Sequence, residues 1–401
     1  MFRMLFLLGI FTLAVAQNIP DRNDLSNYTT GINLPYTSKF SLTKTPTIEA
    51  NIEGIKFTLP VDTASTGLLI GAPQLPSIAN NTGIPTYQYL AKTIYTGRFV
   101  RLNITFPGAK STSARSEIPI LIVDKSVTCP KYNTARNTGK CDDKAAPAND
   151  VSKVLILGIG FGFNLPNSGL PYAIPSHNPF LNIKEVNGAA TTDKTFRSGY
   201  TVSTKGVYLG LTSANTKGYN WVKLDKGATG DSRDWAKVKT QFRVDGSAPY
   251  NGTAVVDTST GYMYVQAEPV GSIPNTTVAD TIHKPHDKNK KMKVVKPGTH
   301  LEFGFPVNKN AEGVAGFDFK VGEKKKGVPE WVFPTRAGKE PHVVAGRGLL
   351  EGFSVAFDAA GGRFGFKCMV CGEEKASETK KVKASRKITT WRYIAAKKAS
   401  A

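Results

Sequence analysis

One stretch of this sequence occurs twice, half a chain length apart. Residues 57–70 read Phe-Thr-Leu-Pro-Val-Asp-Thr-Ala-Ser-Thr-Gly-Leu-Leu-Ile, and residues 252–265 read Gly-Thr-Ala-Val-Val-Asp-Thr-Ser-Thr-Gly-Tyr-Met-Tyr-Val. Each copy is an apolar run, then Asp-Thr and small hydroxyl residues, then a second apolar run. A repeat with so wide a separation predicts two similar lobes rather than a solenoid, whose repeats are far shorter.

The rest of the sequence is typical of an all-β protein. Short runs rich in Val, Ile, Thr, Tyr and Phe alternate with Gly, Pro, Asn and Ser. We expect strands at 52–61, 100–106, 118–123, 206–211, 253–256 and 353–366, and one short helix around 178–186. The pattern predicts packed, partly orthogonal antiparallel sheets, and 401 residues are enough for two lobes.

A second repeated feature supports the division into lobes. Two apolar residues and a glycine follow each Asp copy further along the chain, at Ile156-Leu157-Gly158 and at Val344-Ala345-Gly346. The two sets of repeats therefore predict an N-terminal β lobe at 17–190 and a C-terminal β lobe at 191–372. The residues before them, 1–16, are predicted to be a signal peptide. The basic tail at 373–401 is expected to be disordered or a frayed helix.

The first residues have the pattern of a secretory signal peptide. Arg3 precedes an apolar run that ends in the small-residue pattern Ala14-Val15-Ala16. The run is shorter than the ~20 residues that a membrane-spanning helix needs. We expect cleavage near Ala16 and release as an extracellular monomer with no transmembrane anchor; the alternative is an uncleaved anchor.

Secretion permits disulfides and N-linked glycans. We favour two local disulfides among the four cysteines, although their connectivity stays open. The spacing does not suit a zinc site, and no βαβ pattern surrounds the Cys-x-x-Cys as a redox motif requires. The cysteines are Cys129, Cys141, Cys368 and Cys371. Five sequons predict glycans at Asn27, Asn80, Asn103, Asn251 and Asn275.

The formal net charge is +21, and much of it lies in two basic runs. Residues 373–401 hold nine Lys or Arg against three Glu, and residues 283–296 hold six Lys against one Asp. Such runs are typical of solvated loops and tails, and the alternative is attraction to a polyanionic surface. We expect no nucleic-acid partner, because no stacking-aromatic motif accompanies the basic runs.

No cofactor or metal is expected. The five histidines are scattered along the chain. His283 and His286 are close in sequence, but the lysines around them would repel a cation. Serine-hydrolase chemistry is also disfavoured, because no Gly-x-Ser-x-Gly motif has a credible histidine partner.

The repeated motifs resemble those of the pepsin-like aspartic proteases, particularly secreted fungal members, over residues 35–370. Residues 61–66 and 256–260 are similar to the two catalytic motifs, and the two hydrophobic-hydrophobic-Gly segments are similar to those threaded beneath the aspartates. Residues 355–366 resemble the closing hairpin of the family. The resemblance implies a bilobal all-β fold with a deep cleft between two similar lobes and few short helices.

The resemblance also assigns the site. Asp62 and Asp257 are expected to face each other and share one proton, because two carboxylates about 3 Å apart cannot both ionise. One would activate water and the other would donate a hydrogen bond to the scissile carbonyl. By the same resemblance, hydroxyl groups support the pair: Thr63 and Thr258 brace the two loops, while Ser65 and Thr260 hold the outer carboxylate oxygens.

Two departures from the family leave the function open. Active members have Gly where this chain has Ala64 and Ser259, and a Cβ there is expected to cost about 1–3 kcal/mol of overpacking. Residues 94–97 are similar to the start of the substrate-covering flap, with Tyr95 as the flap tyrosine or, alternatively, an ordinary strand residue. The sequence predicts an acid endopeptidase acting on polypeptides. The alternative is an inactive protein of the same fold that binds a protein or cell-wall ligand.

Overall fold

The computed structural model describes residues 24–370 except 81, 137, 165–169, 171, 268–272, 283–288, 306–314, 326 and 336–339. The predicted signal peptide, the basic tail, Cys371 and part of the second basic run lie outside the described residues. The described chain contains β-strands and short 3-10 helices and no α-helix, which confirms the all-β prediction. None of its helices is long and apolar enough to cross a membrane.

The largest sheet has nine strands, all drawn from residues 47–190. In spatial order they are β10 (Ala189–Ala190), β9 (Ile183–Val186), β7 (Ser113–Thr128), β4 (Thr66–Gly71), β8 (Leu155–Ile159), β3 (Ile55–Asp62), β2 (Thr47–Ile52), β6 (Thr93–Pro107) and β5 (Ile84–Leu90). Because β6 also pairs with β7, the strands from β7 to β6 close into a barrel. Alternate residues of β2 and β6 are buried, as expected for strands with one face in a core.

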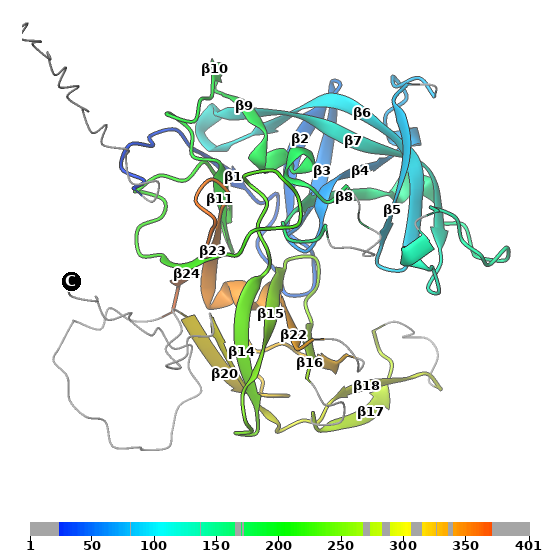
Figure 1. Cartoon of the computed structure of the whole chain (residues 1–401), viewed down its shortest axis with the longest axis vertical. Coiled ribbons are helices and arrows are strands. Elements are labelled where there is room, and N and C mark those ends of the chain that lie inside the picture. Colours follow the sequence, from blue (N-terminus) through cyan, green and yellow to red (C-terminus); the bar gives the residue numbers. More distant parts are fainter. Residues whose placement is uncertain are drawn as a thin grey trace, which may run out of the picture.

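A second sheet has seven strands, all drawn from residues 238–346. In spatial order they are β20 (Ala315–Lys320), β19 (His300–Phe305), β14 (Val238–Val244), β15 (Tyr250–Asp257), β22 (His342–Gly346), β16 (Met263–Gln266) and β21 (Val332–Pro334). A separate pair consists of β17 (Asn275–Ala279) and β18 (Lys291–Val295). Figure 1 shows the nine-stranded sheet in cool colours and the seven-stranded sheet in green to orange. Each of these two sheets therefore contains one copy of the repeated motif.

A six-stranded sheet combines segments from distant parts of the chain. In spatial order it contains β1 (Ile32–Pro35), β12 (Gly206–Leu209), β11 (Gly199–Ser203), β23 (Phe353–Asp358), β24 (Arg363–Cys368) and β13 (Asn220–Lys223). The carboxylate of Asp358 is fully buried between Arg197 and Arg363, and both arginines donate to it. This sheet draws on both predicted lobes, because β1 precedes residue 190 and the other strands follow it.

The remaining helical turns are short. They are η1 (Ala72–Gln74), η2 (Ala109–Ser111), η3 (Thr134–Arg136), η4 (Val151–Lys153), η5 (Pro175–His177), η6 (Pro179–Leu181) and η7 (Arg347–Glu351). Most of the buried apolar side chains of the three large sheets form one continuous cluster. The fold is therefore held mainly by strand pairing and sheet packing.

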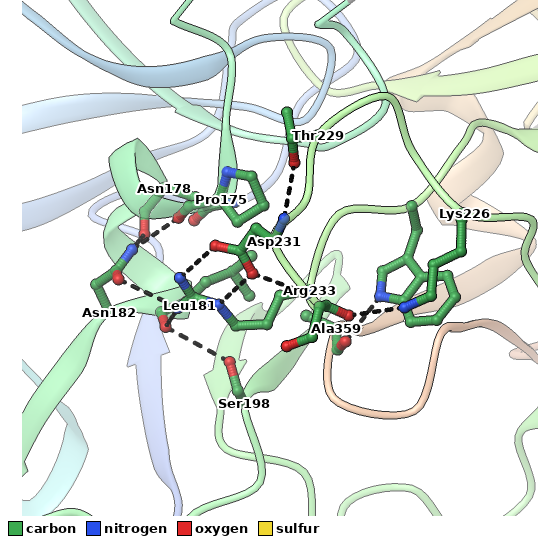
Figure 2. A network of polar contacts seen from close by, with 12 residues as sticks. Pro175, Asn178, Leu181, Asn182, Ser198, Lys226, Thr229, Asp231, Arg233 and Ala359 are labelled. Carbon is green, nitrogen blue, oxygen red and sulfur yellow. Dashed lines mark hydrogen bonds and ion pairs between the residues drawn. The ribbon is translucent and has the colours of Figure 1, made fainter.

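The helix predicted at 178–186 is wrong. Only η6 is helical there, and the chain then becomes β9, which pairs with β7. Asn178 caps the turn by accepting from the amide of Phe180, and Asn182 donates to the Pro175 and Asn178 carbonyls. Arg233 donates to the Leu181 carbonyl and the Asn182 side chain (Figure 2). Strand pairing and side-chain contacts thus replace helical hydrogen bonds, since so short a helix has little stability of its own.

Candidate active site

The first copy of the motif forms a loop, residues 62–65, between two neighbouring strands. β3 ends at Asp62 and β4 begins at Thr66. β8 lies between these strands, parallel to β3 and antiparallel to β4, so that Gly158 pairs with both Asp62 and Gly67. The loop is therefore fixed at both ends by one central strand.

The second copy, residues 257–260, is built in the same way. β15 ends at Asp257, and β22 lies parallel to it and antiparallel to β16. Gly346 pairs with Asp257, as Gly158 pairs with Asp62. The two predicted apolar-apolar-Gly segments thus occupy equivalent places beside the two aspartates.

Both of these glycines allow a close approach that a side chain would block. A Cβ on Gly158 would lie 2.6 Å from the Thr66 nitrogen. A Cβ on Gly346 would lie 2.3 Å from the Tyr262 oxygen. Any larger residue would push the returning strand away from the aspartate loop.

Two threonines join the loops to each other. The amide of Thr63 donates to the Thr258 hydroxyl and the amide of Thr258 donates to the Thr63 hydroxyl, each at 3.1 Å. The Thr63 hydroxyl donates to the Val256 carbonyl at 2.5 Å, and the Thr258 hydroxyl donates to the Val61 carbonyl at 2.6 Å. Both threonines are buried. The two loops are thereby joined at the residues that directly follow Asp62 and Asp257.

The carboxylate of Asp62 has a separate partner for each oxygen. Its Oδ1 accepts from the Ala64 amide at 2.7 Å, and its Oδ2 accepts from the Ser65 hydroxyl at 2.6 Å. Ser65 therefore makes the contact predicted for it. Because Ser65 is buried, water does not compete with its hydroxyl for the Asp62 oxygen.

The carboxylate of Asp257 is held differently. Its Oδ1 accepts both from the Ser259 amide at 2.8 Å and from the Ser259 hydroxyl at 2.6 Å. The hydroxyl of Thr260 accepts instead from the Tyr262 amide. The prediction that the Thr260 hydroxyl holds Asp257 is therefore wrong, because the serine in the expected glycine position lies closer to the carboxylate and takes that role.

Neither substitution of the expected glycines crowds the loops. Ala64 is half-buried and Ser259 is exposed, so their Cβ atoms do not point into a packed interior. Both backbone amides still reach the aspartates. The expectation of overpacking is therefore not met.

Burial and mutual charge raise the pKa values of the pair. Burial raises the pKa of Asp62 to about 7, with a further contribution from the charge of Asp257, while the bonds from Ser65 and Ala64 oppose the shift. Burial also raises the pKa of Asp257, against opposing effects of the Ser259 bonds and the positive charge of Arg347. Because the charge of Asp257 raises the pKa of Asp62, the two carboxyls titrate as a pair, which retains one proton at acid pH.

The hairpin of β5 and β6 carries Tyr95, but its layout differs from the prediction. The hairpin starts at Ile84, and its turn is at Ala91–Lys92, where both residues have positive φ. Tyr95 lies on the returning strand and packs against a buried cluster that includes Leu69 of β4. Gly97 forms a bulge against β7 rather than part of the turn. Residues 94–97 are therefore not the start of the hairpin.

A cavity of about 830 Å³ adjoins the second loop. Ser259 and Thr260 form part of its wall, and much of the rest is apolar, including Val294, Val328 and Trp331. Arg347 also borders it. Arg347 was not predicted as a site residue; its position immediately after the second apolar-apolar-Gly segment was the available signal.

Other predicted residues lie away from the two loops. The Cys129–Cys141 disulfide is confirmed, and the pairing of Cys368 with Cys371 stays a prediction because Cys371 lies outside the described residues. All five sequon asparagines are exposed, as a glycan requires, which leaves glycosylation untested. In the described chain no three His, Cys, Asp or Glu side chains gather as a metal site. His283 and His286 are not among the described residues.

Comparison with known proteins adds no assignment to this geometry. No family model matches the chain, and no curated protein matches it. The arrangement of the two aspartate loops therefore carries the functional argument.

Proposed function

We propose that the chain is a secreted, bilobal aspartic endopeptidase of the pepsin-like type, which hydrolyses peptide bonds at acid pH. One observation carries this proposal: the reciprocal hydrogen bonds of Thr63 and Thr258 hold Asp62 beside Asp257. The nine-stranded and seven-stranded sheets, each with one aspartate loop, support the two-lobed arrangement.

The chemistry needs only the two carboxyls and water. With one proton on the pair, the ionised carboxylate accepts a proton from water as the water oxygen bonds to the peptide carbon. The protonated carboxyl donates its hydrogen bond to the carbonyl oxygen, where negative charge develops. Collapse of the resulting tetrahedral intermediate breaks the carbon–nitrogen bond, and the amine leaves with the proton that the ionised carboxylate took from water.

The cavity beside the second loop indicates the substrate class. Its wall combines apolar side chains with the charged Glu323, Lys324, Lys325 and Glu330. The apolar part and the position next to Ser259 and Thr260 suit an apolar side chain of a bound polypeptide. Its volume of about 830 Å³ is large enough for an aromatic residue. We therefore expect preference for peptides with bulky apolar residues near the cleaved bond.

One observation favours a second candidate, an inactive protein that binds a polypeptide or cell-wall ligand in the same cleft. Ser259 gives both of its hydrogen bonds to a single oxygen of Asp257, whereas both oxygens of Asp62 are held. The Thr260 amide also bonds to Asp257, so the two carboxylates differ in where the hydroxyl bond falls. A hydroxyl that shares one oxygen with an amide orients the carboxylate differently from bonds to separate oxygens, and misplacement near 1 Å can cost about 100-fold in rate.

Peptide cleavage decides between the candidates. The full chain is incubated with a mixed peptide library between pH 3 and 6, with and without pepstatin, beside Asp62→Asn and Asp257→Asn. The proposal expects pepstatin-sensitive cleavage that both variants lose. Pepstatin or peptide binding without cleavage at any pH supports the second candidate, and absence of both overturns the cleft assignment.

A further inference from the structure

We propose that Arg347 is a positioning residue that keeps the negative charge of the pair on Asp257 and leaves the shared proton on Asp62. This inference rests on the proposed function of the two aspartates. It assigns each of them one role in the reaction.

The guanidinium of Arg347 is built into the second loop. Arg347 directly follows Gly346, the partner of Asp257 in β22, and only 3% of the residue is exposed. Its Nε donates to the Thr258 carbonyl at 2.9 Å, and its Nη2 donates to the Ser259 carbonyl at 2.5 Å. These carbonyls belong to the two residues that follow Asp257, so the guanidinium fixes the backbone of the loop.

The same guanidinium ties this loop to a distant segment. Its Nη1 donates to the Leu42 carbonyl at 2.9 Å, and its Nη2 donates to the Thr45 hydroxyl at 3.1 Å. That hydroxyl donates in turn to the Ser259 carbonyl at 3.1 Å. Every nitrogen of the side chain is thus engaged, which gives the cation one fixed position.

The positive charge of Arg347 is not neutralised by its own hydrogen bonds. All four acceptors are neutral oxygens, and in the described chain no carboxylate lies within ion-pair distance of the guanidinium. A buried cation without an ion pair favours a nearby negative charge, because the interior screens it poorly. Asp257 is the acidic group on which its charge acts.

Asp62 has no comparable support. The groups with the largest effects on its pKa are burial, the charge of Asp257, and the bonds from Ser65 and Ala64, and none of them is a cation. The phenols of Tyr262 and Tyr264, which also act on Arg347 or Asp257, are uncharged at acid pH. The cavity that Arg347 borders is also lined by charged side chains, namely Glu323, Lys324, Lys325 and Glu330. Each carboxyl receives one hydroxyl bond and two backbone amide bonds, from Ser65 and Ala64 at Asp62 and from Ser259 and Thr260 at Asp257. The positive charge of Arg347 acts on Asp257 and has no counterpart at Asp62.

This difference assigns the two roles. Ionised Asp257 accepts the proton from the attacking water as the oxygen–carbon bond forms. Asp62 donates its hydrogen bond to the carbonyl oxygen, and Asp257 returns its proton to the nitrogen as the carbon–nitrogen bond breaks. Atoms and charge balance with water as the only co-reactant.

Carbon-13 NMR titration of aspartate carboxyls in the full chain tests the assignment without requiring cleavage. In Asp62→Asn the remaining Asp257 should titrate at a lower pH than the remaining Asp62 does in Asp257→Asn. Titration of Asp62 below Asp257 overturns the proposal. This comparison needs no change at Arg347, so it holds even where an Arg347 variant does not fold.

A second set of variants tests whether the charge of Arg347 lowers the pKa of Asp257. Arg347→Met should raise the pKa of Asp257 by about one unit or more, the scale of a nearby opposite charge, and Arg347→Lys should restore part of the shift. Arg197→Met is the matched control, because Arg197 is equally buried but pairs with Asp358. If Arg347→Met leaves the pKa of Asp257 unchanged, or Arg197→Met shifts it as much, the proposal fails.

Cleavage tests the endopeptidase function, and titration tests the charge assignment to Arg347. Peptide hydrolysis with reversed titration order rejects the assignment to Arg347 and keeps the endopeptidase. The stated titration order without hydrolysis rejects the endopeptidase and keeps the charge assignment.

Discussion

The two aspartate loops share one backbone arrangement and differ in their electrostatic surroundings. In both loops, a strand ends at the aspartate and a glycine of the neighbouring parallel strand pairs with that aspartate. In both, a threonine also bonds across to the other loop. Asp62 has one partner at each oxygen, whereas Asp257 has Ser259 at one oxygen and the charge of Arg347 nearby.

This difference shows how a repeated motif can acquire two roles. The backbone repeat brings two chemically identical carboxyls together, which by itself does not decide which one ionises. The equivalence is broken by a residue that differs between the two copies and by a residue outside the repeat. Ser259 and Arg347 act on one carboxyl alone, so the asymmetry of the site resides mainly in the second loop.

The largest effect is expected from removing either carboxyl. Asp62→Asn and Asp257→Asn should each lower kcat/KM by on the order of 10⁴-fold, because groups that act as a unit fail together. The double variant should lose almost nothing more. Multiplicative losses, measured with the same peptide at pH 5, would show that the two loops act independently.

Stability should depend on pH through the same pair. The pKa of Asp62 is about 7 in the folded chain against 3.8 for the ordinary group, so its contribution is fully present below pH 3.8 and is lost as the pH rises through about 7. The free energy of unfolding should fall by on the order of a few kcal/mol across this window. Urea denaturation at several pH values measures it.

The Asp62→Asn variant serves as the reference for that measurement. Its unfolding free energy should vary less with pH than that of the parent chain, since the group with the raised pKa is gone. If the unfolding free energy varies equally with pH in both proteins, the pH dependence does not come from Asp62. Such a result contradicts the proposed difference between the two loops.

The threonine bonds are expected to matter equally in both loops. Thr63→Ala and Thr258→Ala each remove a buried hydroxyl that donates to a carbonyl of the other loop and accepts from the amide of the other threonine, at a cost of about 1–3 kcal/mol. Serine at either position should keep most of the stability. Thr240→Ala is a suitable control, because that hydroxyl is equally buried but bonds to the Gly304 carbonyl.

Activity separates these threonines from the control. Thr240→Ala should lose stability and retain the rate constant, while both loop variants should lose rate as well. If Thr63→Ala and Thr258→Ala lose unequal amounts of rate, the two loops differ in their backbone support as well as in their charges.

The smallest effects should come from the hydroxyls beside the carboxylates. Ser65→Ala should raise the pKa of Asp62 and Ser259→Ala that of Asp257, each by up to about one unit, since each removes a bond to the charged form. Thr260→Ala should change neither pKa appreciably. NMR titration that finds Thr260→Ala as effective as Ser259→Ala contradicts the assignment of Ser259.

The repeated residues allowed much of the site to be predicted. Adjacent positions specify an apolar strand, Asp-Thr and a second strand, and the resemblance of this pattern to a known family assigned Asp62, Asp257 and the two bracing threonines. The Cys129–Cys141 pair was also predictable, since it closes a short segment. The predictions at Thr260 and at the start of the β5–β6 hairpin went wrong because family spacing was applied where this chain differs.

The sequence by itself determined the strand-rich character of the chain and the two aspartate motifs, and it favoured a local disulfide, because each depends on residues close together in the chain. Only the tertiary structure decided that 178–186 forms a strand after one turn, that Ser259 holds Asp257, and that Arg347 lies beside it. Arg347 meets the Leu42 carbonyl across a separation of 305 residues. Such a contact exists only after the sheets have packed, and no local pattern specifies it.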